Sequence, residues 1–153
     1  MSLSYDVIQA LNGKTVATAE SCTGGRIGAA LTSVPGSSKV YKGGVISYTN
    51  WVKQNVLNVD SDVLEKFGAV SAHVAQAMAE GARLLLNADI AVSVTGLAGP
   101  DGDDFGNPVG TVYIGYADKD KSYVNEYCFT GNREAICMQA VRMALQIICE
   151  ENR

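Results

Sequence analysis

The chain concentrates reactive side chains between residues 18 and 26, where hydroxyls and a thiol precede two glycines and an arginine. An apolar strand is expected to end there and a helix to begin, so the turn presents unpaired backbone N–H groups and the positive end of a helix dipole. Gly24 and Gly25 would let a ligand approach this backbone closely, and Thr23 is expected to cap the helix. The spacing fits neither a Gly-x-Ser-x-Gly nucleophile elbow nor a phosphate-binding P-loop.

Two side chains of this turn are candidate nucleophiles, Ser21 and Cys22. A thiol at the amino terminus of a helix can have a lowered pKa, so a thiol enzyme using Cys22 is one alternative. A serine hydroxyl instead needs a neighbouring base. The only histidine, His73, is expected on the polar face of a helix beside Gln76 and Glu80, where solvent would surround it. Another residue must therefore supply the base.

Lys53 is the candidate base. It lies three residues after Asn50, which can cap a helix, so its ammonium is expected in the first turn, where the helix macrodipole is positive. That position, together with burial, would lower the pKa of the amine, and a neutral lysine is a general base. Ser21 and Lys53 therefore form the hydrolytic pair that the sequence best supplies, and Tyr48, at the end of the preceding strand, could orient either group. The alternative is a solvent-exposed surface lysine.

Two further segments are candidates for binding an anion. The loop of residues 95–108 has glycines at positions 96, 99, 102 and 106, so several of its N–H groups can point into one cavity. Arg133 is expected in the first turn of the last helix, where a bound anion would offset the unfavourable dipole. Glu134 offers the alternative that neighbouring charges merely balance, and Arg26 allows both interpretations.

No metal site is expected. The aspartates at 101, 103 and 104 do not complete an EF-hand loop, and aspartates are ordinary turn residues. The four cysteines contain no Cys-x-x-Cys pair and are expected to be free thiols. Three of them are expected to pack in the core: Cys128, Cys137 and Cys149.

Composition narrows the class of protein. A chain of 153 residues, 47% of them hydrophobic, suits one compact domain spanning residues 1–153. A net charge of −4 without a basic cluster argues against nucleic acid as the partner. No apolar run approaches the roughly 20 residues of a membrane span, and no signal peptide is recognisable, so a cytoplasmic protein is expected.

Hydrophobic periodicity predicts the elements that would position these residues. Helices are expected over residues 5–11, 23–33 and 133–151, after Asn50, and after Ser71, where Val74, Ala75, Met78, Ala82, Leu85 and Leu86 would face inward. Strands are expected over residues 15–19, 39–48 and 89–94, followed by a hairpin of residues 110–116 and 122–129. The sequence therefore predicts an α/β three-layer sandwich, with a mixed, mainly parallel sheet of about five strands and helices on both faces.

These motifs closely resemble the CinA carboxy-terminal domain family, in the family's order and over nearly the whole chain. The segments that carry the resemblance are Ala19-Glu20-Ser21-Cys22-Thr23-Gly24-Gly25, residues 43–50 with Lys53, Gly68-Ala69-Val70-Ser71, residues 94–100 and Pro108-Val109-Gly110-Thr111-Val112. The resemblance implies a nicotinamide-nucleotide amidase, which hydrolyses nicotinamide mononucleotide to nicotinic acid mononucleotide and ammonia in pyridine-nucleotide salvage. It implies no metal or organic cofactor, and self-association into a dimer or trimer.

Carried over by position, the resemblance makes Ser21 the nucleophile, Lys53 the general base and Tyr48 the residue that assists them. Residues expected to bind the pyridine mononucleotide are Thr23, Gly24, Gly25, Thr95, Gly96, Gly99 and Arg133. The chain departs from the family pattern in the loop of residues 101–107 and at Cys137, where the family commonly has a second arginine. The alternative function is a catalytically silent nucleotide-binding or regulatory module of the same family.

Overall fold

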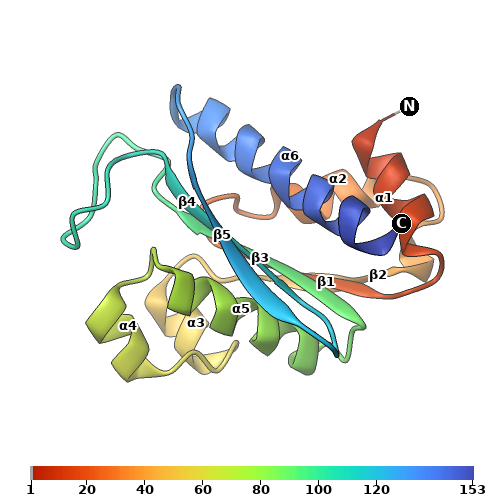
Figure 1. The fold of residues 1–153 in the computed structure, drawn as a ribbon, viewed down its shortest axis with the longest axis horizontal. Helices are drawn as coiled ribbons and strands as arrows, with labels where there is room; N and C mark the ends of the chain where they lie inside the picture. Colours follow the sequence, from red (N-terminus) through yellow and green to blue (C-terminus); the bar gives the residue numbers. More distant parts are fainter. Residues whose placement is uncertain (1) are drawn as a thin grey trace.

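The computed structural model describes residues 2–153, which form a five-stranded sheet between two layers of helices (Figure 1). The strands are β1 (Val16–Glu20), β2 (Tyr41–Ile46), β3 (Ile90–Gly96), β4 (Thr111–Ala117) and β5 (Ser122–Cys128). They lie in the order β2-β1-β3-β4-β5. β1 pairs in parallel with β2 and β3, whereas β4 pairs antiparallel with β3 and β5. The predicted mixed sheet with a parallel core is confirmed.

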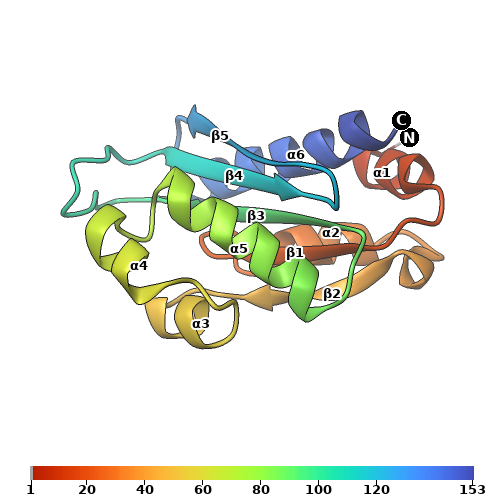
Figure 2. The ribbon, with the colours of Figure 1, turned by 60° about the horizontal axis from the view of Figure 1, so that its bottom comes forward.

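Helices cover both faces of the sheet (Figures 1 and 2). One layer holds α1 (Leu3–Leu11), α2 (Arg26–Thr32) and α6 (Arg133–Asn152). The other holds α3 (Asn50–Asn55), α4 (Ser61–Phe67) and α5 (Ala72–Leu85), and a short 3₁₀ turn (Ser37–Lys39) precedes β2. Of the helices in residues 2–153, none combines the length and apolar character that a membrane crossing needs.

Each face of the sheet has its own apolar core, and β1 contributes to both. Val16 packs with α1, α2 and α6, whereas Ala17 and Ala19 pack with α5. Successive side chains of a strand point to opposite faces, so a strand covered on both sides is buried along its whole length. All five residues of β1 are buried, in agreement with the buried strand predicted from the sequence.

Polar side chains close several helix ends, and among the N-caps that of α5 is the one predicted from the sequence. The Ser71 hydroxyl accepts the Val74 N–H at 3.2 Å, and the Asn132 side chain accepts the Ala135 N–H at 2.9 Å. Asn12 ends α1 in the left-handed conformation, with φ of 49°. These contacts satisfy backbone groups that a helix end otherwise leaves unpaired, and so fix where α5 and α6 begin.

Two residues predicted to pack inward are exposed. Leu85 is 52% exposed, because the last turn of α5 lies beside residues 56–58 and lines an open groove with them. Cys128 is exposed because it ends the edge strand β5. Cys137 and Cys149 are buried as predicted, and all four cysteines are free thiols.

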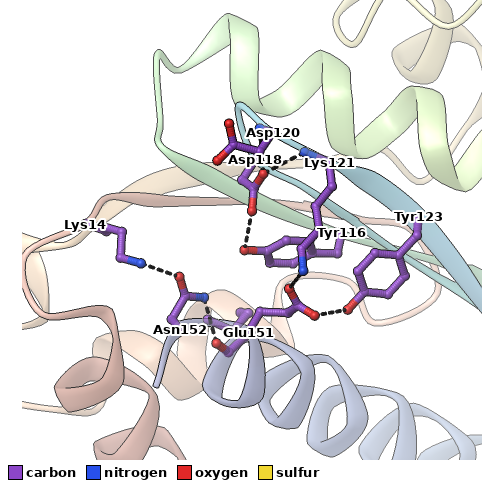
Figure 3. A network of polar contacts seen from close by, with 9 residues as sticks. Lys14, Tyr116, Asp118, Asp120, Lys121, Tyr123, Glu151 and Asn152 are labelled. Atoms are coloured by element: carbon purple, nitrogen blue, oxygen red, sulfur yellow. Dashed lines mark hydrogen bonds and ion pairs between the residues drawn. The ribbon is translucent and has the colours of Figure 1, made fainter.

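A polar network joins the β4–β5 turn to the end of α6 (Figure 3). The Tyr116 hydroxyl donates to the Asp118 carboxylate at 3.1 Å. Lys121 forms an ion pair with Glu151, which also accepts a hydrogen bond from the Tyr123 hydroxyl at 3.3 Å. The network secures the predicted hairpin at the end of the sheet where β1 and β3 begin.

Candidate active site

A cavity of ≈ 440 Å³ lies where the carboxyl ends of β1, β2 and β3 meet at one edge of the sheet. Crevices outside the carboxyl ends of parallel strands are where α/β proteins bind ligands. Most of the predicted site residues line it: Ser21, Tyr48, Lys53, Thr95, Gly96, Gly99 and Arg133. They come from the turn after β1, the loop after β2, α3, the end of β3 with its following loop, and the start of α6.

Ser21 and Lys53 meet inside this cavity. The Lys53 Nζ lies 3.0 Å from the Ser21 Oγ and 2.7 Å from the carbonyl oxygen of Ser47. Ser21 follows β1 directly, and the Ser47 N–H donates to the Glu20 carbonyl at 2.8 Å, which continues the pairing of β1 with β2 beyond the strands. Strand pairing therefore brings the hydroxyl and the amine together across 32 residues of sequence.

Burial lowers the pKa of Lys53 to about 8. The side chain is 1% exposed, and removing an ammonium from water disfavours its charged form. Of the two causes predicted from the sequence, burial is confirmed and the position in the first helical turn is wrong. Thr49, not Asn50, caps α3 by accepting the Val52 N–H at 3.4 Å, and Lys53 lies in the last turn of this six-residue helix. Desolvation, and not the positive end of the helix dipole, makes the amine a base.

Glu20 is a structural residue of the site that the sequence did not identify as such. Its side chain is 2% exposed, and both carboxylate oxygens accept hydrogen bonds at the start of α2. One oxygen accepts the Thr23 hydroxyl and the Ile27 N–H, each at 2.8 Å, and the other accepts the Gly28 N–H at 3.0 Å. A carboxylate is favoured at the amino end of a helix dipole. Glu20 therefore fixes the turn on which Ser21 lies.

Thr23, Gly24 and Gly25 do not line the cavity. The helix begins at Arg26, later than predicted, and Gly25 rather than Thr23 is its N-cap. Thr23 is fully buried, and its hydroxyl donates to Glu20. Gly24 and Gly25 have φ angles of 56° and 101°, a conformation that glycine adopts without strain. These residues shape the turn behind Ser21.

Cys22 is a poor nucleophile in this arrangement. It lines the cavity, but burial raises its pKa to about 12, the opposite of the lowering expected at a helix amino terminus. Cys137 is 1% exposed, and its thiol donates to the Cys22 carbonyl at 3.3 Å. The thiolate that a cysteine mechanism needs is therefore disfavoured.

Arg133 and Tyr48 meet at another part of the cavity. The Arg133 guanidinium donates to the Tyr48 hydroxyl at 2.9 Å and also to the Gly99 carbonyl oxygen. Glu134 does not balance Arg133, because its carboxylate pairs with Arg26 at 3.0 Å. The Tyr48 hydroxyl is therefore hydrogen-bonded to Arg133. The sequence had led us to expect Ser21 or Lys53 as its partner.

The glycine-rich loop is held in place by its own side chains. The Thr95 hydroxyl donates to the Ala69 carbonyl at 2.8 Å, which joins the end of β3 to the segment before α5. The Asp103 carboxylate accepts the Phe105 and Asn107 N–H groups at 3.1 and 3.0 Å. A side chain at Gly96 would lie 2.9 Å from the Thr111 carbonyl, so only glycine fits there.

No cluster of three potential metal ligands occurs within residues 2–153. Asp103 is occupied by the hydrogen bonds of its own turn. The His73 ring is exposed on α5 and stacks on Phe67 with centroids 3.7 Å apart, as expected for a histidine outside the site. The side chains that line the cavity include the Ser21 hydroxyl, the Lys53 amine, the Tyr48 phenol and the Arg133 guanidinium, together with the Cys22 thiol and the Asp101 carboxylate.

This arrangement suits acyl transfer. A neutral amine hydrogen-bonded to a serine hydroxyl can take its proton as the oxygen attacks a carbonyl carbon. The Ser47 carbonyl orients the amine by accepting one of its N–H groups. A guanidinium elsewhere in the same cavity can hold an anionic part of the same molecule.

Comparison with known proteins identifies relatives over nearly the whole chain. Residues 2–151 match the family model described as the CinA C-terminal domain. A CinA-like protein of Endomicrobium trichonymphae is 47% identical over 137 residues, which are 90% of this chain and 32% of that protein. A CinA-like protein of Thermotoga neapolitana is 45% identical over 135 residues, 88% of this chain and 33% of that protein. The chain spans about a third of the length of these relatives.

Solved structures share the fold closely. The competence damage-inducible protein A (ComA) from Klebsiella pneumoniae is 38% identical, with a TM-score of 0.95 over 97% of this chain and 94% of that chain. The competence/damage inducible protein CihA from Agrobacterium tumefaciens is 39% identical, with a TM-score of 0.94 over 99% of this chain and 94% of that chain.

Proposed function

Because the chain belongs to the CinA C-terminal domain family, which includes amidases, we propose that it is a nicotinamide-nucleotide amidase. It hydrolyses nicotinamide mononucleotide to nicotinic acid mononucleotide and ammonia. One observation carries the proposal: the Lys53 amine, with a pKa lowered by burial to about 8, lies 3.0 Å from the Ser21 hydroxyl in a cavity that also contains Arg133.

The reaction proceeds through an acyl-enzyme. The Ser21 Oγ attacks the carboxamide carbon while the Lys53 amine takes the hydroxyl proton, and the carbonyl oxygen becomes an oxyanion. The backbone N–H of Cys22, next to the nucleophile, and those of Thr95 and Gly96 are the donors we assign to this oxyanion. Lys53 then delivers the proton to the nitrogen as the C–N bond breaks and ammonia leaves. Water, deprotonated by Lys53, attacks the ester carbon, and Lys53 returns that proton to the Ser21 Oγ as the acyl–oxygen bond breaks and the carboxylic acid leaves.

Substrate binding uses the other side of the cavity. The Arg133 guanidinium binds the phosphate, and the backbone of residues 95–99 contacts the nucleotide. Support comes from the position of Arg133, which donates to two neutral acceptors and forms no ion pair with a carboxylate in residues 2–153. A guanidinium without a counter-ion is suited to a phosphate group. No cofactor takes part in this mechanism.

The test is ammonia release from nicotinamide mononucleotide by the purified protein, beside Ser21→Ala and Lys53→Ala. Matched controls are Ser38→Ala and Lys39→Ala, whose side chains are exposed outside the cavity. We expect hydrolysis by the wild type and both controls, and its loss in both site variants. Nucleotide binding without any ammonia release by the wild type would refute the amidase and support a binding module.

We also propose that the protein acts in the cytoplasm as a homo-oligomer of two or three copies. Large exposed apolar side chains, such as Leu84 at 71% and Trp51 at 68% exposure, are available for self-association. Light scattering of the purified protein at micromolar concentration tests the oligomer, and a monomer mass would contradict it.

A further inference from the structure

The hydroxyl of Tyr48 acts only as an acceptor towards Arg133. The Arg133 Nη2 donates to the Tyr48 Oη at 2.9 Å, and a guanidinium nitrogen has no lone pair to accept in return. The phenolic proton therefore does not take part in this bond. Tyr48 lines the cavity and is 55% exposed, so its proton is available to a ligand.

The pair of Ser21 and Lys53 is complete without Tyr48. A neutral Lys53 amine offers two protons and one lone pair. The Lys53 Nζ donates to the Ser47 carbonyl at 2.7 Å and to the Ser21 hydroxyl at 3.0 Å. Once the amine is neutral, its lone pair can take the place of the donated proton and accept from the Ser21 hydroxyl. Ser47 is fully buried, so this contact is shielded from water. No step in the proton transfer between these two residues requires the phenol.

Arg133 is held by two hydrogen bonds, and its guanidinium forms no ion pair with a carboxylate in residues 2–153. Its two contacts, to the Gly99 carbonyl and to Tyr48, are both neutral acceptors. Glu134, its neighbour in the chain, is engaged by Arg26 at 3.0 Å. A guanidinium that has used two of its five N–H groups on neutral acceptors still has three for an anion. The bond from Arg133 also polarises the Tyr48 O–H, which strengthens the hydrogen bond that Tyr48 can donate.

We propose that Tyr48 and Arg133 together form a clamp for the phosphate of the substrate, so that Tyr48 determines specificity rather than assisting proton transfer. This inference deepens the proposed function and rests on it for the identity of the substrate. Arg133 binds one non-bridging oxygen of the phosphate, and the Tyr48 hydroxyl donates to another.

The clamp favours a terminal phosphate over an internal one. A phosphate monoester carries roughly −1.5 to −2 charges at neutral pH and three acceptor oxygens. A phosphate within a dinucleotide has two ester-type bonds, hence one fewer free oxygen and a single charge. Two donors fixed side by side therefore select a mononucleotide over the corresponding dinucleotide, and over a nucleoside that lacks phosphate.

The experiment compares Tyr48→Phe with wild type on nicotinamide mononucleotide and on nicotinamide riboside, which has the same amide and no phosphate. Tyr5→Phe is the matched control, because Tyr5 lies on α1, outside the cavity. We expect Tyr48→Phe to raise KM for the mononucleotide about tenfold, in line with a lost hydrogen bond to a charged group, and to lower kcat far less. With the riboside, kcat/KM should change less than twofold.

Two outcomes would overturn the clamp. One is an equal fall of kcat on both substrates in Tyr48→Phe, which would assign the phenol to the reacting groups. The other is unchanged KM for the mononucleotide. If the wild type hydrolyses neither substrate, the proposed function fails, and the clamp is tested by calorimetric binding of nicotinic acid mononucleotide. Binding about tenfold weaker in Tyr48→Phe supports the clamp, and equal binding refutes it.

Discussion

The pH dependence of hydrolysis follows from the burial of Lys53. Its pKa is lowered from 10.5 to about 8, chiefly by desolvation. At pH 7 about 9% of the amine is then neutral, against about 0.03% for an unshifted lysine, so burial supplies about 300 times more of the active base. We therefore expect kcat/KM to rise about tenfold between pH 7 and pH 9, with an apparent pKa about 8.

The assay is the initial rate of nicotinic acid mononucleotide formation, followed by chromatography from pH 6 to pH 10 and corrected for hydrolysis without enzyme. Cys22→Ala should keep the same profile, because burial places the pKa of that thiol at about 12, far above the observed range. A rate that does not change between pH 7 and pH 9, or a rise centred near 10.5, would refute the assignment of Lys53 as a buried base.

Three further predictions concern stability. Lys53→Met should abolish hydrolysis yet raise Tm at pH 7, because burying the charged amine costs roughly 3 kcal/mol at pH values below its folded pKa. This gain in stability over wild type should shrink between pH 8 and 10.5, because there the unfolded wild-type chain binds more protons than the folded one, so wild-type stability rises with pH. Glu20→Gln should lower the free energy of unfolding, measured in urea, by about 2–4 kcal/mol, because an amide cannot accept all three hydrogen bonds that the carboxylate accepts at the start of α2. The control Glu65→Gln, at an exposed position, should change it by less than about 0.5 kcal/mol. Gly81→Ala should lower Tm although alanine favours helices, because the new Cβ would lie 2.1 Å from the Leu57 carbonyl oxygen.

These stability predictions each have a contradicting result. A Lys53→Met protein less stable than wild type at pH 7 would mean that the lost hydrogen bonds outweigh the relief of desolvation. Equal urea midpoints for Glu20→Gln and wild type would show that the turn holding Ser21 does not depend on the carboxylate. An unchanged or higher Tm for Gly81→Ala would show that α5 and the segment of residues 56–58 separate easily.

Local sequence signals predicted the fold well because its elements obey short-range rules. The Ser71 cap, the β4–β5 hairpin and the buried strand β1 are each specified by a few neighbouring residues. The contact between Ser21 and Lys53 was predicted from their chemistry, and the pairing of β1 with β2 provides it.

Features that depend on tertiary packing were not predictable in the same way. Glu20 is an acidic residue within a short apolar strand, and only the fold shows that its carboxylate caps α2. The pKa of Lys53 depends on how deeply α3 is buried, which no helix-capping pattern reveals. Tyr48 is bonded to Arg133, 85 residues away, and a strand-end tyrosine gives no sign of that partner.

The parallel pairing of β1 with β2 also has a consequence for how the protein folds. Parallel neighbouring strands need a crossover connection, which here contains α2. The contact of Ser21 with Lys53 is therefore non-local, and the chain between the two residues must close into a loop before the contact can form. Contacts of this kind form slowly compared with the hairpin of β4 and β5. A refolding chain would therefore regain helix signal before activity, and the recovery of hydrolysis would report the moment at which the edge strand β2 docks.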